Sequence, residues 1–263
     1  MKNKKPNKAV EAAPSPTAGE RINRFMAHCG LCSRREADQW IVDGRVLVNG
    51  KKINQPGIKI MPTDKVEVDG KLVSMQSETI TLVYNKPAGL LCSRKDHKNR
   101  PLIYSRLNVP ANVQSIGRLD MDSEGLLLLT NDGDLAYQLT HPSFQIPRQY
   151  RVRVAGELTL ETIARLRNGG IDMGRDERSV PWDLTIDSES RGHCWITVTL
   201  KQGRWREIRR TLEAVEHPVR RLIRTRFGPL KLDEEMPAGA WRELTAKELR
   251  SLKSMVKVAA RPK

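Results

Sequence analysis

The chain has 263 residues, with 46 Lys and Arg against 31 Asp and Glu, which give a formal net charge of +15 at pH 7 and a pI near 9.9. This charge favours a polyanionic partner, nucleic acid above all, and the length allows one large domain or a large and a small one. No apolar run approaches the ~18 residues that a membrane-spanning helix needs, so we expect no membrane segment.

The cysteines, Cys29, Cys32, Cys92 and Cys194, are too few and too scattered to predict a disulfide framework. Cys29 and Cys32 form a Cys-x-x-Cys pair, but no second pair follows, so a zinc site is not predicted. The basic residues 1–8 lack an apolar region and do not resemble a secretory signal. We therefore expect a cytoplasmic protein with reduced thiols.

The first part of the chain predicts a short tail and then a small folded unit. Residues 1–19 hold almost nothing to bury, which is typical of a disordered basic tail. Apolar residues then recur at helical spacing from Ile22 to Cys29, and Ser-Arg-Arg-Glu at 33–36 is a capping box that begins a second helix. Val46–Val48 followed by Asn49-Gly50 indicates a β-hairpin.

Residues 20–70 thus predict a domain of two helices and small strands, too small to hold an enzyme site of its own. Basic residues gather around the second helix and the hairpin, and could either bind RNA or simply form a solvated surface. They are Arg34, Arg35, Arg45, Lys51 and Lys52.

A polar linker over 71–79 is expected to lead into the larger domain, 80–252. Residues 80–84 alternate in polarity and predict a strand that ends at Lys86-Pro87-Ala88-Gly89. The loop at 93–101 is rich in basic residues, including Arg94, and we expect it to face RNA.

The most informative stretch is residues 117–133, where an acidic turn with Asp120, Asp122 and Glu124 precedes four leucines. The leucine run predicts a buried strand. The turn could be no more than a loop, and its first half also fits an EF-hand calcium loop. The calcium interpretation fails downstream, because Asn131 occupies the position where a bidentate Glu is needed.

The C-terminal half predicts alternating strands and helices. Residues 149–154 form an expected strand with Tyr150 on its apolar face, 159–168 a helix, and 194–200 a strand. The segment 201–226 contains nine basic residues and three acidic ones, and an apolar stripe at Ile208, Leu212 and Val215 predicts a helix within it. A last helix is expected from 245, followed by a basic tail over 253–263.

Three segments resemble known families. Gly117-Arg118-Leu119-Asp120, then Ser123 and Gly125 and an apolar run into Thr130-Asn131, resembles the signature of the small-ribosomal-subunit class of RNA pseudouridine synthases, and within that class the type that acts on the large subunit. Residues 33–50 resemble the S4 RNA-binding domain. Residues 202–210 resemble the class pattern Gly, basic, Asn, Arg, Gln, hydrophobic, Arg, Arg, with Trp205 in place of Asn and Glu207 in place of Gln.

The resemblance, which extends from about residue 20 to about 250, implies an α+β fold: a small S4-like domain and a catalytic domain built on a mixed, mostly antiparallel sheet. The implied reaction isomerises a uridine of ribosomal RNA, of the large subunit in particular, to pseudouridine without metal or cofactor. Asp120 matches the catalytic carboxylate, Arg209 its cationic partner, and Tyr150 the tyrosine that stacks on the extruded base.

Phosphate contacts are expected from Arg94, Arg118 and Arg210. The expected partner is ribosomal RNA or a pre-ribosomal particle, bound by a monomer. Two other functions fit parts of the sequence: a non-catalytic RNA-binding ribosome-assembly factor, and a metal-dependent nuclease that uses the three carboxylates of the turn.

Overall fold

The computed structural model describes residues 19–73, 78–190 and 192–259. Residues 1–18 of the tail expected over 1–19, residues 74–77 of the expected linker and residues 260–263 of the expected C-terminal tail lie outside the described residues. The chain divides into two units, one holding the residues up to 79 with Pro110–Asn112, and one holding residues 80–109 and 113–263. We describe each unit by itself.

In the N-terminal unit, helices α1 (Ile22–His28) and α2 (Arg34–Val42) pack with short strands around one apolar core. The strand order β3-β2-β5-β6 is formed by Lys51–Lys52, Val46–Val48, Val66–Val68 and Lys71–Leu72. A second pair joins β1 (Glu20–Arg21) to β4 (Lys59–Ile60). The elements expected here from the sequence, two helices and a hairpin, are all present.

Local signals explain these elements. The Ser33 hydroxyl accepts from the Glu36 N–H, and the Glu36 carboxylate accepts from the Ser33 N–H, which completes the predicted capping box. Asn49 and Gly50 both have positive φ, at 52° and 75°, as a tight two-residue hairpin turn requires. Strand β6 and the buried Val73 extend this unit past residue 70, so the first residues of the predicted linker belong to the fold.

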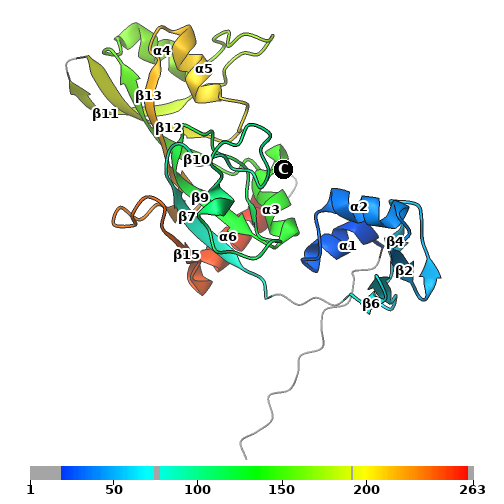
Figure 1. Ribbon diagram of the computed structural model, residues 1–263. Coiled ribbons are helices and arrows are strands. Elements are labelled where there is room, and N and C mark those ends of the chain that lie inside the picture. The colour runs from blue at the N-terminus through cyan, green and yellow to red at the C-terminus, as the bar shows by residue number, and fades with distance from the viewer. Residues whose placement is uncertain (1–18, 74–77, 191, 260–263) are drawn as a thin grey trace, which may run out of the picture. The chain divides into compact units, whose positions relative to one another are not determined.

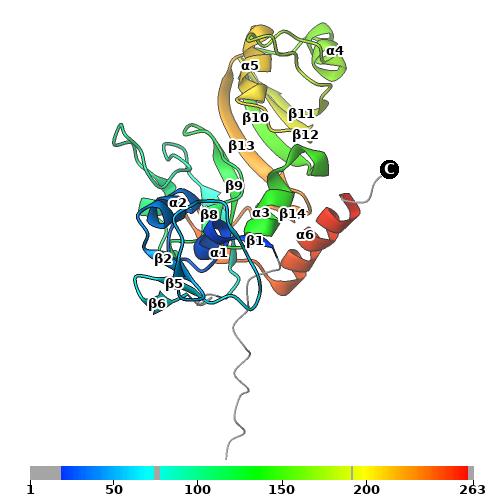
Figure 2. The same ribbon diagram turned by 90° about the vertical axis from the view of Figure 1, so that its right-hand side faces the viewer.

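The second unit is built on one twisted sheet, which runs β11-β12-β10-β13-β9-β7-β15 and has nine strands among the described residues (Figures 1 and 2). In that order the strands are Asp183–Ser190, His193–Leu200, Arg148–Ala155, Val219–Phe227, Glu124–Thr130, Thr81–Lys86 and Trp241–Glu243. Strands β8 (Gln114–Ser115) and β14 (Leu230–Lys231) pair beside β9 and β13. Among the described strands of this sheet only β9 and β13 are parallel, so the expected mostly antiparallel sheet is confirmed.

The leucine run of β9 is buried on both faces. Leu126 and Leu128 pack with α3 (Gly133–Thr140) and α6 (Ala246–Ala259), whereas Leu127 and Leu129 pack with the segment between β7 and β9, which includes the short helix η1 (Ile103–Ser105). Every one of these leucines is fully inaccessible to solvent, as a continuous apolar run predicts.

At the other end of the sheet, β10 to β13 form a third core with α4 (Leu160–Asn168) and α5 (Glu207–Ala214) (Figure 1). The short helix η2 (Pro142–Phe144) follows α3. The last helix corrects one expectation: residues 253–259 are the final turns of α6 rather than a tail, because Val256 packs in the same core as Leu252.

Candidate active site

The acidic turn leads into β9 at Gly125, a position where any side chain would clash with the neighbouring strand. Gly125 has a φ of +97°, and a Cβ added there would lie 2.4 Å from the carbonyl oxygen of Arg224. Arg224 is its partner in the parallel pairing of β9 with β13. Because the two backbones approach so closely, the turn is fixed beside the β9–β13 pairing, which joins the two halves of the sheet.

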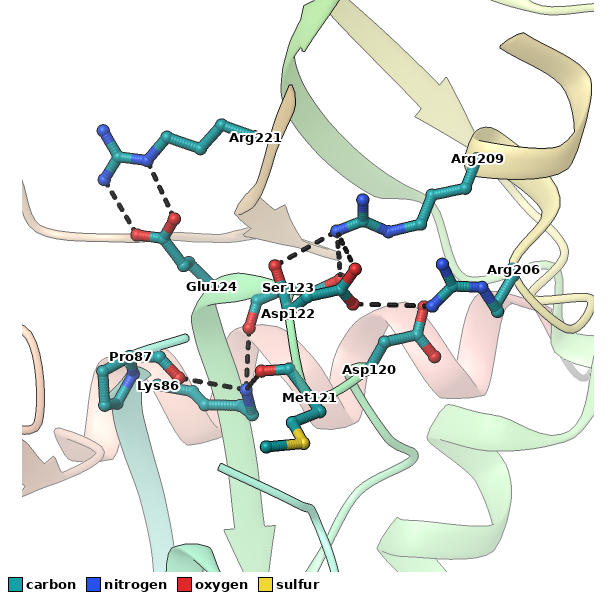
Figure 3. Close-up of polar contacts among 10 residues, drawn as sticks. All are labelled: Lys86, Pro87, Asp120, Met121, Asp122, Ser123, Glu124, Arg206, Arg209 and Arg221. Carbon is teal, nitrogen blue, oxygen red and sulfur yellow. Dashed lines mark hydrogen bonds and ion pairs between the residues drawn. The ribbon is translucent and has the colours of Figure 1, made fainter. Parts of the chain in front are cut away.

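A buried lysine holds the backbone of the same turn. Lys86 is fully buried at the end of β7, and its Nζ donates to the carbonyls of Pro87, Met121 and Ser123 at 3.0, 3.3 and 2.7 Å (Figure 3). Burial lowers the pKa of this ammonium group. The sequence predicted Lys86 only as the start of a turn. A lysine at the end of an apolar strand, directly before Pro-Ala-Gly, is the feature that could have indicated a buried lysine at the site.

A cavity of about 340 Å³ lies beside the turn and brings the predicted site residues together. Its walls include Asp120 from the turn, Tyr150 from β10 and Arg209 from α5. Tyr150 is half-buried, because its ring packs against two of the apolar cores, and the register pairs it with Val198 on one side and Arg224 on the other. The three residues expected from the sequence to form one site therefore line one cavity.

The ion pairs of the site differ from the expected one. Arg209 Nη2 lies 3.1 Å from Asp122 Oδ2, donates to the Asp122 carbonyl at 3.1 Å and reaches Ser123 Oγ at 3.4 Å. Arg206 Nη1 lies 3.5 Å from Asp120 Oδ2 and 3.5 Å from Asp122 Oδ1 (Figure 3). Among the described residues, the cation in contact with Asp120 is thus Arg206, and the predicted direct pair of Arg209 with Asp120 is not formed.

The backbone conformation at residue 206 explains why Arg206, and not Arg209, contacts Asp120. Arg206 is the N-cap of α5 and has a left-handed backbone, with φ 47°, so it precedes the first helical residue, Glu207. Its side chain therefore leaves the helix start towards the turn, while Arg209, one turn further on, meets Asp122. Burial lowers the pKa of Arg209, an effect that the negative charge of Asp122 opposes.

Residues 80–214 match the family model described as RNA pseudouridylate synthase, and residues 20–66 match the S4 domain. The chain belongs to the RNA pseudouridine synthase family. Relatives named ribosomal large subunit pseudouridine synthase B include one from Bacillus subtilis, 35% identical over 90% of this chain and 96% of the relative. Another, from Buchnera aphidicola, is 36% identical over 90% of this chain and 97% of the relative.

A relative of the same name from Pseudomonas aeruginosa is 38% identical over 90% of this chain, and the match spans 62% of that protein. A solved structure described as pseudouridylate synthase matches with a TM-score of 0.65 and 29% identity, and covers 88% of this chain and 99% of that one. The expected enzyme class, the S4 domain and the α+β fold are confirmed by these matches.

Two arginines of this pseudouridine synthase that we expected to contact phosphate are engaged within the protein. Arg94 donates to the Val113 carbonyl at 2.5 Å, and its guanidinium lies 4.0 Å from the ring centroid of Tyr104. Arg210 donates to the carbonyls of Met173 at 3.0 Å and Gly174 at 2.7 Å.

Arg210 also pairs with Glu177, and its side chain is only 10% exposed. The structure thus gives Arg94 and Arg210 structural partners, whereas Arg118 is exposed and lines the cavity, so that its phosphate contact stays a prediction.

In the N-terminal unit, the side chains of Arg34, Arg35, Lys51 and Lys52 are exposed, as an RNA-binding role requires. Arg45 is the exception. Its guanidinium pairs with Asp69 and lies 4.4 Å from the Trp40 ring centroid, so it has partners within the unit although its side chain stays 39% exposed.

Two further observations concern metals and membranes. Among the described residues, no group of three or more His, Cys, Asp or Glu side chains is placed to hold a metal ion, so the three carboxylates of the turn do not converge as the nuclease hypothesis needs. Glu124 instead pairs with Arg221 at 2.8 Å.

Over the part of the chain that the structure describes, no helix is long and apolar enough to cross a membrane.

Proposed function

We propose that this synthase isomerises a uridine of large-subunit ribosomal RNA, with Asp120 as the catalytic carboxylate. The observation that carries the proposal is that Asp120, Tyr150 and Arg209 line one cavity of about 340 Å³. The relatives from Bacillus subtilis and Buchnera aphidicola, which align over nearly their whole length, are named as large-subunit enzymes.

The chemistry assigned to Asp120 needs an ionised carboxylate. In the reaction the N1–C1′ bond breaks, uracil turns, C5 bonds to C1′, and the proton of C5 is lost while N1 gains one. Asp120 starts this sequence either by attacking C1′ or by removing a ribose proton, and only the carboxylate form can do either. The guanidinium of Arg206 lies 3.5 Å from this carboxylate, where it can pair with the negative charge.

Arg209 takes a positioning role in this proposal. It contacts the Asp122 carboxylate and carbonyl and the Ser123 hydroxyl, so it fixes the backbone directly after Asp120. Lys86 fixes the same backbone from the opposite side through the carbonyls of Met121 and Ser123. Two cations therefore hold the turn in one geometry before substrate binds.

Tyr150 offers its ring to the extruded uracil. Taking a base out of an RNA helix costs a few kcal/mol, and stacking on an aromatic ring offsets part of that cost. The exposed basic residues of the S4 domain bind the surrounding RNA, either free or in a pre-ribosomal particle. We propose that the protein does so as a monomer in the cytoplasm.

Mapping of pseudouridine in ribosomal RNA, from cells with and without this protein, tests the proposal. We expect one uridine of large-subunit RNA to lose its modification in the deletion, and the wild-type gene to restore it. The Asp120→Asn gene should not. An unchanged map would refute the substrate, and restoration by Asp120→Asn would refute the role of Asp120.

A further inference from the structure

Trp205 is a large aromatic side chain held at the surface beside the candidate active site. It is 52% exposed in the loop that leads into α5. It stands where the class pattern has Asn, so its presence needs an explanation specific to this chain. A half-exposed indole gives up burial of a large apolar surface, which makes a binding role worth testing.

Trp205 belongs to the walls of two cavities. The first, of about 340 Å³, contains Tyr150 and Arg209, and the second, of about 760 Å³, is formed with the segment between β7 and β9. Both cavities include Asp120, Arg118 and Arg206. The indole therefore lies at the boundary between the cavity assigned to the reacting uridine and a larger second cavity.

The protein holds this indole in place. The Arg175 guanidinium lies 4.1 Å from its ring centroid and that of Arg210 lies 5.3 Å away. Arg210 also donates to the Trp205 carbonyl at 3.3 Å, and is itself bound to carbonyls of residues 173 and 174. A ring fixed in this way loses little conformational freedom when it binds a ligand.

The second cavity has the charge that a nucleotide needs. Lys95, Arg100 and Arg118 line it, and the Arg100 side chain stays 45% exposed although it pairs with Asp96. A cavity with a cationic wall and an aromatic wall fits a phosphate and a base of one nucleotide. Its volume exceeds that of the first cavity, so it has room for a nucleotide outside the one that reacts.

We propose that Trp205 stacks on the base of an unpaired nucleotide next to the target uridine, and that this nucleotide lies in the second cavity. This inference rests on the proposed placement of the target uridine between Asp120 and Tyr150. The two aromatic side chains would then hold two neighbouring bases out of the RNA helix, each in its own cavity.

A double-mutant cycle between protein and RNA tests the inference. The probe is a stem-loop that carries the mapped uridine, together with versions in which the nucleotide on either side of it is abasic. Because stacking on an aromatic ring contributes roughly 1–3 kcal/mol per base, Trp205→Ala should raise Kd about fivefold or more, and Trp205→Phe should recover most of the loss. One of the abasic probes should weaken wild-type binding by a similar factor and leave the Trp205→Ala variant unaffected.

The control is Trp241→Ala, which removes another exposed tryptophan, on β15 and outside both cavities, and should leave Kd unchanged. Thermal unfolding of each variant separates a loss of contact from a loss of fold. Additive effects of Trp205→Ala and both abasic probes, with a folded variant and an active wild type, would overturn the inference. A wild type that fails to modify the intact stem-loop would instead refute the proposed function.

Discussion

Arg34 and Arg35 begin helix α2 of the S4 domain with exposed side chains, whereas Arg209 and Arg210 on α5 of the catalytic unit are about nine-tenths buried. The first pair faces water. Apart from the nearby Trp205 carbonyl, the second pair donates to carbonyls and carboxylates that lie 33 to 87 residues away along the chain.

Arginine therefore has different functions in the two regions. Exposed arginines can exchange counterions for RNA phosphates, so they contribute affinity that falls with salt. Buried arginines are already desolvated and hydrogen-bonded to protein atoms, so they hold the segments that they bind in a fixed geometry and do not contribute affinity for RNA. We expect substitutions in the S4 domain to change binding and substitutions around the turn to change rate.

The largest effect should come from the catalytic unit. Asp120→Asn keeps the shape of the turn and removes the carboxylate, so we expect the single-turnover rate at saturating RNA to fall at least about a thousandfold while Kd changes little. Rapid quench with pseudouridine detection would measure the rate, and filter binding the affinity.

Asp122→Asn is the matched control for this substitution. From the sequence alone it should be far milder, and the structure adds that Asp122 pairs with Arg209 and Arg206. We therefore expect a loss of about tenfold, between the wild type and Asp120→Asn. Equal losses in the two variants would contradict the assignment of Asp120.

Arg209→Ala should be next, with a loss of about a hundredfold in the single-turnover rate and a small change in Kd, because Arg209 holds the turn rather than the RNA. Arg209→Lys should recover only part of the rate, since an ammonium group cannot reproduce the forked guanidinium contacts. A normal rate in Arg209→Ala would show that Lys86 alone is enough to hold the turn.

The S4 domain should show the reverse pattern. Arg34→Ala with Arg35→Ala should weaken RNA binding about tenfold at low salt and leave the rate at saturation unchanged. The slope of log affinity against log salt should become shallower by about one unit for each lost phosphate contact. Titrations from low to moderate salt would test this, and identical slopes would mean that α2 does not contact RNA.

The smallest effect concerns stability. Glu207 is 3% exposed, and burial raises its pKa above the ordinary value of 4.5, an effect that backbone hydrogen bonds from Arg204 and Val180 oppose only in part. The folded state then holds its proton to higher pH than the unfolded state, so this group's contribution to stability is lost as pH rises through the raised pKa.

Glu207→Gln should therefore gain about 1 kcal/mol in free energy of unfolding at neutral pH. The gain should disappear below pH 4.5, where the wild-type carboxyl is protonated in both states. Glu213→Gln, on the exposed part of the same helix, should show no such dependence. Urea unfolding at several pH values would compare the two, and a gain that does not vary with pH would rule out the buried charge as its cause.

Local patterns predicted most of the fold because the interactions behind them are local. Ser33 and Glu36 cap α2 within one turn, and the alternation of Cys194 with Ile196 and Val198 reports one buried face of β12. The end of α6 was not predicted because, of the described residues beyond Leu252, only Val256 is buried, with Met255 partly buried, among exposed lysines.

The site was predictable in its residue types but not in its pairing. Resemblance placed Asp120, Tyr150 and Arg209 together, since each matched a position of the class pattern. The pairing of Arg206 with Asp120 depends on a left-handed backbone at the start of α5, and a non-glycine residue gives little sign of that. Arg210 is not available for RNA because it binds the loop at 173–177, and no local sequence pattern predicts this long-range contact.

Strand β13 carries one more consequence, because it lies between β10 and β9 in the sheet. Without it, β11-β12-β10 and β9-β7-β15 are two separate sets of strands (Figure 1). The first set packs on one apolar core and the second on two others. During synthesis, the carboxylates of the turn leave the ribosome 84 or more residues before the arginines that face them. We therefore expect a nascent chain to gain catalytic competence only after β13 has been made and inserted into the sheet.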